Sequence, residues 1–450
     1  MKGLATRLKF QVEDVIRFST VTRELTSRWL QSQAMRIPRI DDQQRILFIK
    51  KLCSAATLTR DLHHRYTLED LIKKNVSELT GHDIDWTQVF PHVRDRNIST
   101  AVVLKPRVSP RERGIILISF ERQWIKLLHF HVAQEVRERY ILVIAPSWTP
   151  PHSCGVTAFP RLYPDRVLST ISHDNDMETL PRLSQGKIIP VPLLASNWVV
   201  PENFEPLPHE QRDVDIIMVA TFGKYKRHHA LLQAMAKLPR SLRVLLIGIK
   251  GDDLDADGIR ALARAFGVES MLIDVRAEDY AETMQAFCRS KISVITSKRE
   301  GSCQVVVESM FANTPVGILE NAELGSRKYV NHHTGGLLRE DRLAEDIMAL
   351  LDRSSSMSPR DWVMDHAVDC IGSTHTLNGA LRDFALASGE EWTRDIVPHA
   401  WNPYPDILRP QDVKSLLPAY RDIESRFGLR IGLDRTRWLS EHQAPPVAKT

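Results

Sequence analysis

Two glutamates eight positions apart stand in the segment SKREGSCQVVVESMFANTPVG, residues 297–317. Glu300 precedes a Gly-Ser pair, and Glu308 lies within an apolar run. A carboxylate on a buried helix requires hydrogen-bond donors, because burying its charge alone is costly. Sugar hydroxyls would be suitable donors to Glu300, and ribose hydroxyls to Glu308. The alternative is a surface glutamate and a salt-bridged glutamate at the start of an ordinary helix.

The residues between the two glutamates can form an anion site. A strand is predicted over 291–297, and the helix that follows it begins around Ser302 or Cys303. Gly301 allows a ligand to approach the backbone closely, and Ser302 can cap the helix or bond a phosphate oxygen. The N–H groups of the first helical turn, together with the helix dipole, suit a phosphate.

A second polar run, SHDNDMETLP (172–181), also follows a predicted strand. Its His173, Asp174 and Asp176 can bind the hydroxyls of an acceptor, and His173 can provide a base; a helix-capping run is the alternative. Trp148 ends another predicted strand and can stack on the face of a sugar, with a core position as the alternative.

No metal site is predicted from the sequence. The five cysteines are scattered without CxxC or Cys/His metal spacing, and such a sparse, odd set suits a reducing compartment. His129 and His131 stand two apart on a predicted helix, so they face different sides. The stretch Gly248-Ile-Lys-Gly lacks the rest of a dinucleotide fingerprint, which disfavours an enzyme that uses NAD.

Short apolar runs that alternate with helical segments indicate two parallel α/β units that position these residues. The first is predicted over 101–206, and the second, doubly wound, over 207–354. Helical periodicity predicts extensions over 1–100 and 355–450, the latter without strands. Ligands of such sheets bind at the carboxyl ends of the strands, where the polar residues above are expected. The predicted strands are 113–120, 141–148, 165–172 and 187–194, then 214–222, 242–248, 270–275, 291–297 and 314–320, with one helix over 121–140.

Charge and hydropathy exclude some classes of protein. A net charge of +4 over 450 residues is too weak to indicate nucleic-acid binding. No signal peptide and no spanning helix are predicted, so we expect a cytoplasmic location. Residues 1–36 carry seven Lys/Arg against three Asp/Glu, with apolar residues near helical spacing. This helix either contacts the inner face of a membrane peripherally or packs on a domain with a solvated basic face.

The spacing Ser-x-x-Glu-Gly-x6-Glu-x-Met-x-x-x-x-Pro-Val resembles the C-terminal domain of retaining GT-B glycosyltransferases of the family 4 type, the glycosyl transferases group 1. The matching residues are Ser297, Glu300, Gly301, Glu308, Met310, Pro315 and Val316. The stretch VATFGKYKRHHALLQAMAKL is similar to the first strand and helix of that domain, where a lysine contacts the donor diphosphate. Lys226 occupies that position. The resemblance covers roughly residues 113–352 and is strongest from 214 onward.

The resemblance implies two facing Rossmann-like domains, a nucleotide-diphosphate sugar as donor, and no cofactor or required metal. It implies that Glu300 contacts the donor sugar, Glu308 the ribose and Lys226 the diphosphate. The amides of Gly301, Ser302 and Cys303 would support the phosphates and the leaving group.

This sequence departs from the family pattern at two places. Thr221 stands where the family usually has an arginine, and Lys224 or Arg227 can supply that cation instead; a solvated basic loop is the alternative reading of both. The segment SFERQW replaces the glycine-rich turn that usually follows the first strand of the N-terminal domain.

The function implied is transfer of a sugar to an unidentified glycan, lipid-linked or small-molecule acceptor, with retention of configuration. One alternative is a nucleotide-sugar epimerase on the same fold. Another is a non-catalytic GT-B scaffold whose helical extensions bind a partner protein.

Overall fold

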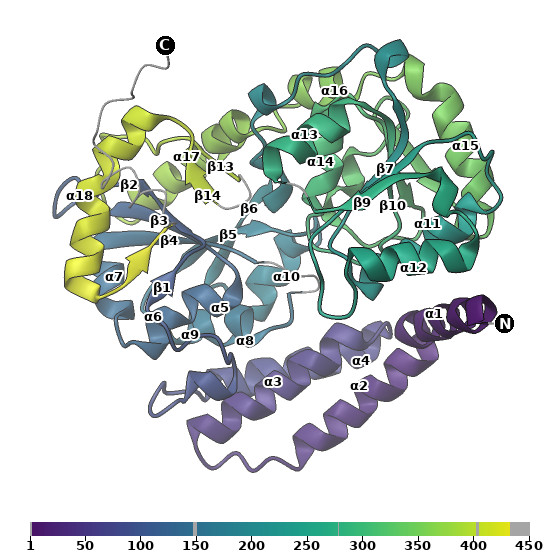
Figure 1. Cartoon of the computed structure of the whole chain (residues 1–450). Coiled ribbons are helices and arrows are strands. Elements are labelled where there is room, and N and C mark those ends of the chain that lie inside the picture. The colour runs from purple at the N-terminus through teal and green to yellow at the C-terminus, as the bar shows by residue number, and fades with distance from the viewer. Residues whose placement is uncertain (1, 147–150, 278, 402–404, 433–450) are drawn as a thin grey trace. The chain divides into compact units, whose positions relative to one another are not determined.

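The computed structural model describes residues 2–146, 151–277, 279–401 and 405–432 (Figure 1). It divides into two compact units, each described by itself below. Unit 1 comprises Met1–Leu25 and Leu194–Asp369, and unit 2 comprises Thr26–Leu193 and Cys370–Thr450. The first 25 residues thus group with the second predicted α/β segment, and the C-terminal extension from Cys370 onward groups with the first.

Unit 1 contains a six-stranded sheet in the order β12-β11-β10-β7-β8-β9, and every adjacent pair is parallel. Strand order therefore reverses between β7 and β10, which makes the carboxyl ends of these two strands the switch point where ligands bind in doubly wound sheets. The strands are β7 (Val214–Val219), β8 (Val244–Ile247), β9 (Leu272–Arg276), β10 (Ser290–Ile295), β11 (Val316–Leu319) and β12 (Gly335–Leu338).

The helices of unit 1 begin and end where the local sequence directs. In α12 the Asp255 side chain accepts a hydrogen bond from the N–H of Gly258, and the helix ends at Gly267 with φ +68°. Gly248 after β8 is required by a close approach, since a Cβ there would lie 1.9 Å from the carbonyl oxygen of Ala220. The helices are α11 (His228–Met235), α12 (Ala256–Phe266), α13 (Tyr280–Cys288), α14 (Gln304–Phe311), α15 (Leu343–Arg353) and α16 (Pro359–Asp365).

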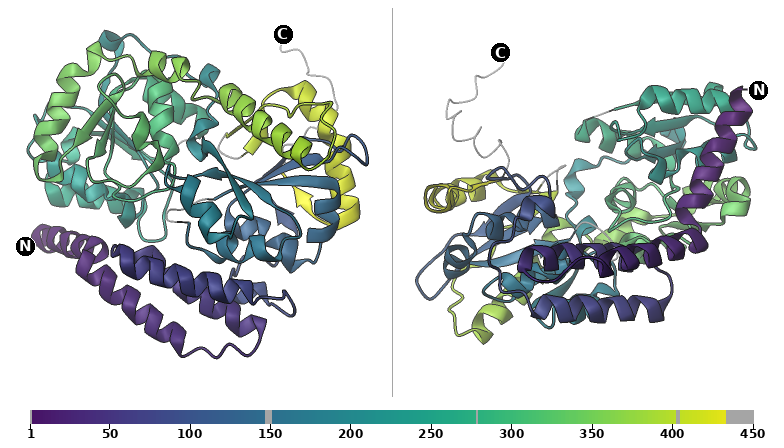
Figure 2. Two further views of the ribbon diagram at one scale, coloured as in Figure 1. Left: turned by 180° about the vertical axis from the view of Figure 1, so that it is seen from behind. Right: turned by 90° about the horizontal axis from the view of Figure 1, so that it is seen from below.

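Helix α1 (Lys2–Phe18) packs against α12 of unit 1 (Figures 1 and 2). The Arg7 guanidinium lies 5.2 Å from the centre of the Phe266 ring. The Gln11 side-chain amide donates to the Gln233 carbonyl at 3.2 Å. Both contacts are made by polar residues of α1.

Unit 2 contains a five-stranded sheet in the order β2-β3-β4-β5-β6. Strands β3, β4 and β5 are parallel to one another, and β2 is antiparallel to β3. The predicted α/β class with two Rossmann-like sheets is confirmed. The strands are β2 (Ala101–Lys105), β3 (Gly114–Ser119), β4 (Tyr140–Ala145), β5 (Val167–Ile171) and β6 (Ile188–Leu194).

Two details of unit 2 differ from the sequence prediction. Strand β2 was not predicted, because its five buried residues form a run too short to distinguish from a loop before Pro106. The single helix predicted over 121–140 is three short ones, interrupted by His131, whose φ is 54°. His129 therefore ends one helix and His131 lies outside it. The short helices are α5 (Glu121–Trp124), α6 (Lys126–His129), α7 (Ala133–Arg139), α8 (Cys154–Thr157) and α9 (Phe159–Leu162), followed by α10 (Asp176–Leu183).

The helices predicted at the N-terminus are present in the structure. Helix α2 (Thr20–Met35) runs across the division between the units, and α3 (Asp42–Leu58) and α4 (Leu62–Ser77) belong to unit 2. Asp41 caps α3 by accepting from the N–H of Gln44, and Asp61 caps α4.

The C-terminal segment of unit 2 contains α17 (Cys370–Ala387) and α18 (Pro410–Phe427). The prediction that it lacks strands is wrong. The strands were missed because two or three residues are too few to show a periodicity in the sequence. The short strands are β13 (His399–Trp401), β14 (Pro405–Ile407) and β15 (Arg430–Ile431), the last paired with β1 (Asn97–Ile98). Among the described helices, none has the length and apolar character needed to cross a membrane.

Candidate functional site

The loops that follow β7 and β10 bring Lys226 and Glu300 together at the switch point of the unit 1 sheet. The Nζ atom of Lys226, in the 3-10 helix Lys224–Lys226, lies 2.8 Å from a carboxylate oxygen of Glu300. Both side chains are largely buried, with exposed fractions of 16% and 12%. The Thr296 hydroxyl donates to the backbone carbonyls of Lys226 and Arg227, at 2.9 and 3.0 Å, and so ties the two loops together.

Burial lowers the pKa of Lys226, but the Glu300 carboxylate outweighs that effect and leaves the pKa above its usual value. The lysine is therefore a fixed positive charge over the ordinary pH range. A buried, charged amine beside a carboxylate at a sheet edge can bind a diphosphate through the amine and a hydroxyl through the carboxylate.

The backbone of the loop after Glu300 uses its carbonyls and leaves its N–H groups available. The carbonyls of Gly301 and Ser302 accept from the N–H groups of Gly325 and Ser326, at 2.8 and 3.1 Å. The carbonyl of Cys303 accepts from the Ser326 hydroxyl at 3.0 Å. Within the described part of the chain, no acceptor is recorded for the N–H groups of Gly301, Ser302 or Cys303. These N–H groups stand at the start of α14, where an anion is favoured.

Ser302 does not cap α14. Its Oγ accepts a hydrogen bond from the N–H of Ala195 at 3.0 Å, and the N-cap is Cys303, with φ 54° and no side-chain cap. Burial raises the pKa of the Cys303 thiol well above its usual value, so the thiol stays protonated. Cys303 therefore contributes its backbone rather than its sulfur to this site.

Glu308 lies one turn into α14 and is 6% exposed. Burial raises its pKa to about 7, against hydrogen bonds from Tyr280 and from Gln304, whose Nε2 lies 3.0 Å from a Glu308 oxygen. The salt-bridged alternative is not seen, because no described Lys, Arg or His forms an ion pair with Glu308. Further hydroxyl donors would stabilise the ionised form of such a buried carboxylate.

The two alternative cations of the basic loop are held by α1. The Nζ atom of Lys224 lies 2.8 Å from a Glu13 oxygen. Arg227 is 2% exposed, forms a two-pronged ion pair with Asp14 at 2.7 and 2.7 Å, and also pairs with Glu340. Lys226, between them, faces Glu300 instead.

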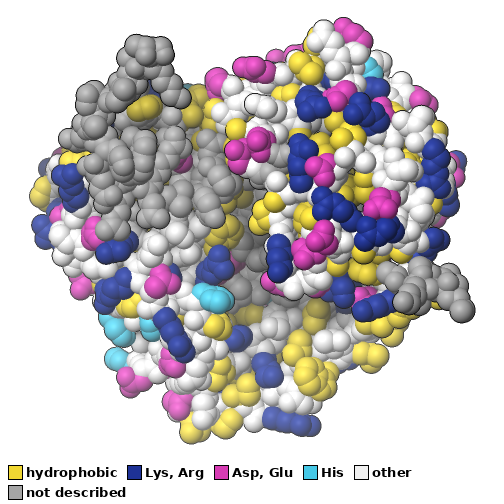
Figure 3. Space-filling view, viewed as in Figure 1, with side chains coloured by type: hydrophobic (Ala, Val, Ile, Leu, Met, Phe, Trp, Pro, Cys, Tyr) yellow, Lys and Arg dark blue, Asp and Glu magenta, His cyan; other side chains and the backbone are white. Residues whose placement is uncertain are grey.

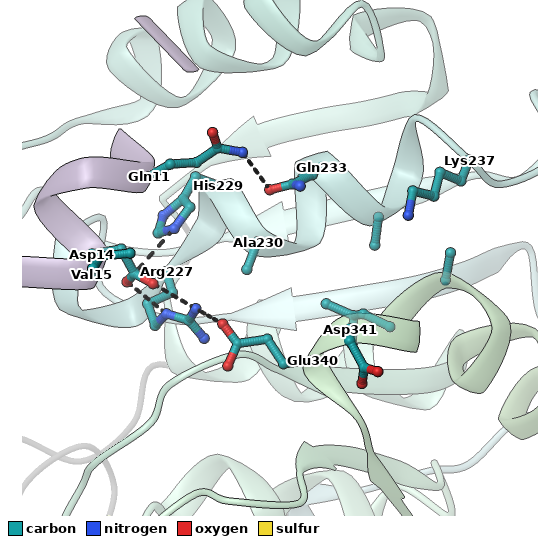
Figure 4. A pocket seen from close by; sticks show the side chains of 13 residues that line it. Gln11, Asp14, Val15, Arg227, His229, Ala230, Gln233, Lys237, Glu340 and Asp341 are labelled. Atoms are coloured by element: carbon teal, nitrogen blue, oxygen red, sulfur yellow. Dashed lines mark hydrogen bonds and ion pairs between the residues drawn. The ribbon is translucent and has the colours of Figure 1, made fainter. Parts of the chain in front are cut away.

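Glu13, Asp14 and Glu340 were missed in the sequence. Burial opposes ionisation of Asp14, but hydrogen bonds from His229 and Arg227 hold its pKa far below the usual value. Figure 4 shows this network beside a pocket of about 320 Å³ between α1, α11 and the start of α15. The only signal in the sequence was the adjacent acid pair in a basic helix, and spacing alone does not reveal partners more than 200 positions away.

Residues 199–362, which contain both loops, match the family model described as "Glycosyl transferases group 1". Over this range the chain is similar to the glycosyl transferases group 1. The resemblance to that group is confirmed there, and the retaining, family 4 type stays a prediction. No curated protein matches the sequence.

Several solved structures are similar to the chain at low sequence identity. Sucrose-phosphate synthase from Thermosynechococcus elongatus is 17% identical, with a TM-score of 0.47, over 61% of this chain and 74% of that one. Anabaena Alr3699/HepE, in complex with UDP and glucose, is 15% identical, with a TM-score of 0.45, over 60% and 78%. The pneumococcal O-GlcNAc transferase GtfA, in complex with UDP and GlcNAc, is 13% identical, with a TM-score of 0.39, over 57% and 53%.

Thr221 stands in the loop after β7, and its backbone carbonyl accepts from the N–H of Gly223 at 2.7 Å. Its half-buried side chain carries no charge. Since Lys224 and Arg227 pair with α1, Lys226 is the cation that this loop presents to Glu300.

The polar run predicted for the acceptor lies in unit 2, outside residues 199–362, directly after β5. One Asp176 carboxylate oxygen accepts from the N–H groups of Ser172 and His173, at 2.8 and 3.0 Å. Burial raises the pKa of Asp176 despite these hydrogen bonds. Asp174 lies in the same turn, and its carbonyl accepts from the N–H of Met177. Trp148 lies outside the described residues.

A buried ionic cluster in unit 2 was also missed in the sequence. The Nε2 atom of His152 lies 2.7 Å from a Glu69 oxygen, and Arg182 pairs with the same carboxylate. Glu69 comes from α4, so the cluster holds that helix to the unit 2 α/β core. Within the described residues, no group of His, Cys, Asp and Glu has an arrangement suited to a metal ion.

Proposed function

We propose that this protein transfers a sugar from a nucleotide-diphosphate sugar to an acceptor. The observation that carries the proposal is the Lys226–Glu300 pair at 2.8 Å at the switch point of a group 1 glycosyltransferase domain. The resemblance to the family 4 type supports retention of configuration.

In this proposal Lys226 and the N–H groups of Gly301, Ser302 and Cys303 bind the diphosphate. The bond between the anomeric carbon and the diphosphate oxygen breaks, an acceptor oxygen bonds to that carbon, and the acceptor proton leaves. Negative charge on the departing diphosphate is stabilised by the buried ammonium and the fixed N–H dipoles. Because these groups supply the positive charge, the proposed step requires no divalent metal.

Glu300 accepts hydrogen bonds from hydroxyls of the donor sugar and holds Lys226 in place. Glu308 accepts from the ribose, whose hydroxyls add donors to a carboxylate that otherwise titrates near pH 7. Ribose binding therefore favours the ionised form of Glu308.

On the acceptor side, we propose that the turn after β5 contacts hydroxyls through Asp174, with His173 as base. Asp176 acts there by closing the turn, since its carboxylate accepts from two N–H groups of that turn. The acceptor class stays open among glycans, lipid-linked sugars and small molecules.

A non-catalytic, donor-binding scaffold is the second candidate. Thr221 supplies no charge, and the pairing of Lys224 and Arg227 with Glu13 and Asp14 favours this alternative. The two functions differ in turnover, because a scaffold binds a donor without breaking its glycosidic bond.

The test combines binding with hydrolysis. Wild type is incubated with a panel of UDP-, GDP-, ADP-, CDP- and dTDP-sugars, and thermal shift and slow release of the nucleoside diphosphate are measured. We expect one donor both to stabilise the protein and to be hydrolysed. Binding without hydrolysis supports the scaffold, and an altered sugar supports an epimerase.

Glu300→Gln tests the assignment of the site. We expect hydrolysis to fall by about a hundredfold, with Glu282→Gln, an exposed carboxylate on α13, as the matched control. Wild-type hydrolysis in Glu300→Gln, with the fold retained, would refute the role of Glu300.

A further inference from the structure

Helix α1 packs on unit 1 with polar side chains and two phenylalanines, and leaves a row of aliphatic side chains exposed. The polar contacts are hydrogen bonds and ion pairs of Arg7, Gln11, Glu13 and Asp14. The rings of Phe10 and Phe18 also lie against unit 1, next to His229 and Lys298. A helix at the surface of a globular domain ordinarily turns its aliphatic side chains toward the core. The exposed aliphatic row of α1 is therefore a candidate contact surface.

The outer face of α1 carries four aliphatic side chains. Leu8, Val12, Val15 and Ile16 follow the i, i+4, i+7, i+8 spacing that places residues on one side of a helix. Each is between 51% and 67% exposed. A row of this length on one face differs from the single exposed apolar residues that any surface contains.

Helix α2 extends the pattern with a row of its own. Val21, Leu25 and Trp29 are spaced four apart and are between 57% and 68% exposed. The buried residues Ser27 and Ala34 lie on the other side of the helix. The Ser27 hydroxyl donates to the carbonyl of Ala55 in α3 at 2.9 Å, so that side of α2 is already covered.

The exposed charged residues of this part of unit 1 are basic. Glu13 and Asp14 are paired with Lys224 and Arg227, and Glu24 is half-buried. Between Arg7 and Leu25, the exposed charged residues are Lys9 and Arg17. Further along α2, Arg28 pairs with the exposed Asp61 at 3.7 Å. Figure 3 shows hydrophobic side chains among Lys and Arg side chains along α2.

We propose that the outer face of α1, with Val21 and Leu25 at the start of α2, binds the surface of an anionic membrane. The aliphatic side chains would enter the boundary between headgroups and acyl chains, and Lys9 and Arg17 would meet the anionic headgroups. A second copy of this chain fits the surface less well, because it would bring two basic rows together. This inference does not depend on the proposed sugar transfer.

Vesicle flotation of the full chain tests the proposal. We expect the protein to float with vesicles of phosphatidylcholine and phosphatidylglycerol, to float much less with phosphatidylcholine alone, and to lose part of its binding at high salt. The double variant Val12→Glu/Leu25→Glu should weaken partition by about tenfold or more. Its melting temperature should stay near that of the wild type, because both side chains are exposed.

The matched control is Met364→Glu/Leu386→Glu, which changes exposed apolar residues of α16 and α17 and should float like the wild type. Failure of the wild type to float with anionic vesicles overturns the proposal, as does flotation that Val12→Glu/Leu25→Glu leaves unchanged. A stable dimer in light scattering that the same variant dissociates also overturns it, since a second copy would then cover the face.

Discussion

The loops after β10 in unit 1 and after β5 in unit 2 both carry carboxylates, but they use their backbone N–H groups in opposite ways. After β10, the carbonyls of Gly301 and Ser302 are bonded to the neighbouring segment, and the N–H groups have no recorded acceptor within the described residues. After β5, the Asp176 carboxylate already accepts from the N–H groups of Ser172 and His173. The first loop can therefore bind an anion, whereas the N–H groups of the second loop are already bonded to its own aspartate.

On the basis of this difference, we propose that the two loops bind different ligands. A diphosphate requires positive charge and free N–H donors, and the Lys226 loop with the Gly301 turn offers both. A loop whose amides are bonded to its own aspartate suits a neutral, hydroxyl-bearing molecule. The proposed division of donor and acceptor between the units rests on this contrast.

The largest expected effect is that of Lys226→Met. Removing the buried ammonium should lower donor turnover by roughly a hundred- to a thousandfold, because one fixed charge at the leaving group is lost. The measurement is steady-state release of nucleoside diphosphate, with Lys237→Met, an exposed lysine at the end of the α11 segment, as control. Equal turnover in the two variants would show that Lys226 does not stabilise the leaving group.

Glu308 should make stability depend on pH. Its folded pKa is raised to about 7 from 4.5, so the folded state binds the proton more tightly than the unfolded state. Its contribution is complete below about pH 4.5 and is lost as pH rises through 7, a change of about 3 kcal/mol. In Glu308→Gln, the unfolding free energy measured with urea should depend less on pH between about pH 5 and pH 8. A variant as pH-dependent as the wild type would contradict the assignment.

Asp14→Asn and Glu13→Gln separate a buried ion pair from a half-exposed one on the same helix. Breaking the two-pronged contact with Arg227 should cost about 2–3 kcal/mol of unfolding free energy, because Arg227 is buried. Losing the Glu13–Lys224 pair should cost under about 1 kcal/mol. If Asp14 positions the Lys226 loop, Asp14→Asn also raises the KM for donor more than it lowers kcat, and Asp14→Glu partly restores it. Equal losses of stability in both variants would show that burial does not decide the outcome.

Asp176→Asn should have the smallest effect on the hydrolysis of the donor. We expect a loss of about 1–2 kcal/mol in unfolding free energy, since the turn loses hydrogen bonds to a charged acceptor, and donor hydrolysis in water that stays near wild type. Calorimetric unfolding and the hydrolysis assay measure both. A large fall in hydrolysis would mean that the turn after β5 also binds the donor, which would contradict the difference proposed between the two loops.

Most of the fold could be predicted because buried parallel strands are continuous apolar runs, as in IILIS of β3 and VLLI of β8. Strand β2 and the two- or three-residue strands β13, β14 and β15 give no such signal. The motif pointed to Lys226 and Glu300 as donor-site residues, but it did not predict the ion pair between them. The pairing of Arg227 with Asp14 was not predicted either, because a basic run such as KYKR does not reveal which cation another element will bind.

The central claim is that Lys226 and the Gly301 turn bind a diphosphate. Isothermal titration of UDP, GDP, ADP, CDP and dTDP into the full chain and into Lys226→Met tests it most directly. The account predicts that one nucleoside diphosphate binds the wild type and binds Lys226→Met at least tenfold more weakly, in about the proportion expected for one lost charge-assisted contact. Unchanged affinity in Lys226→Met would contradict it.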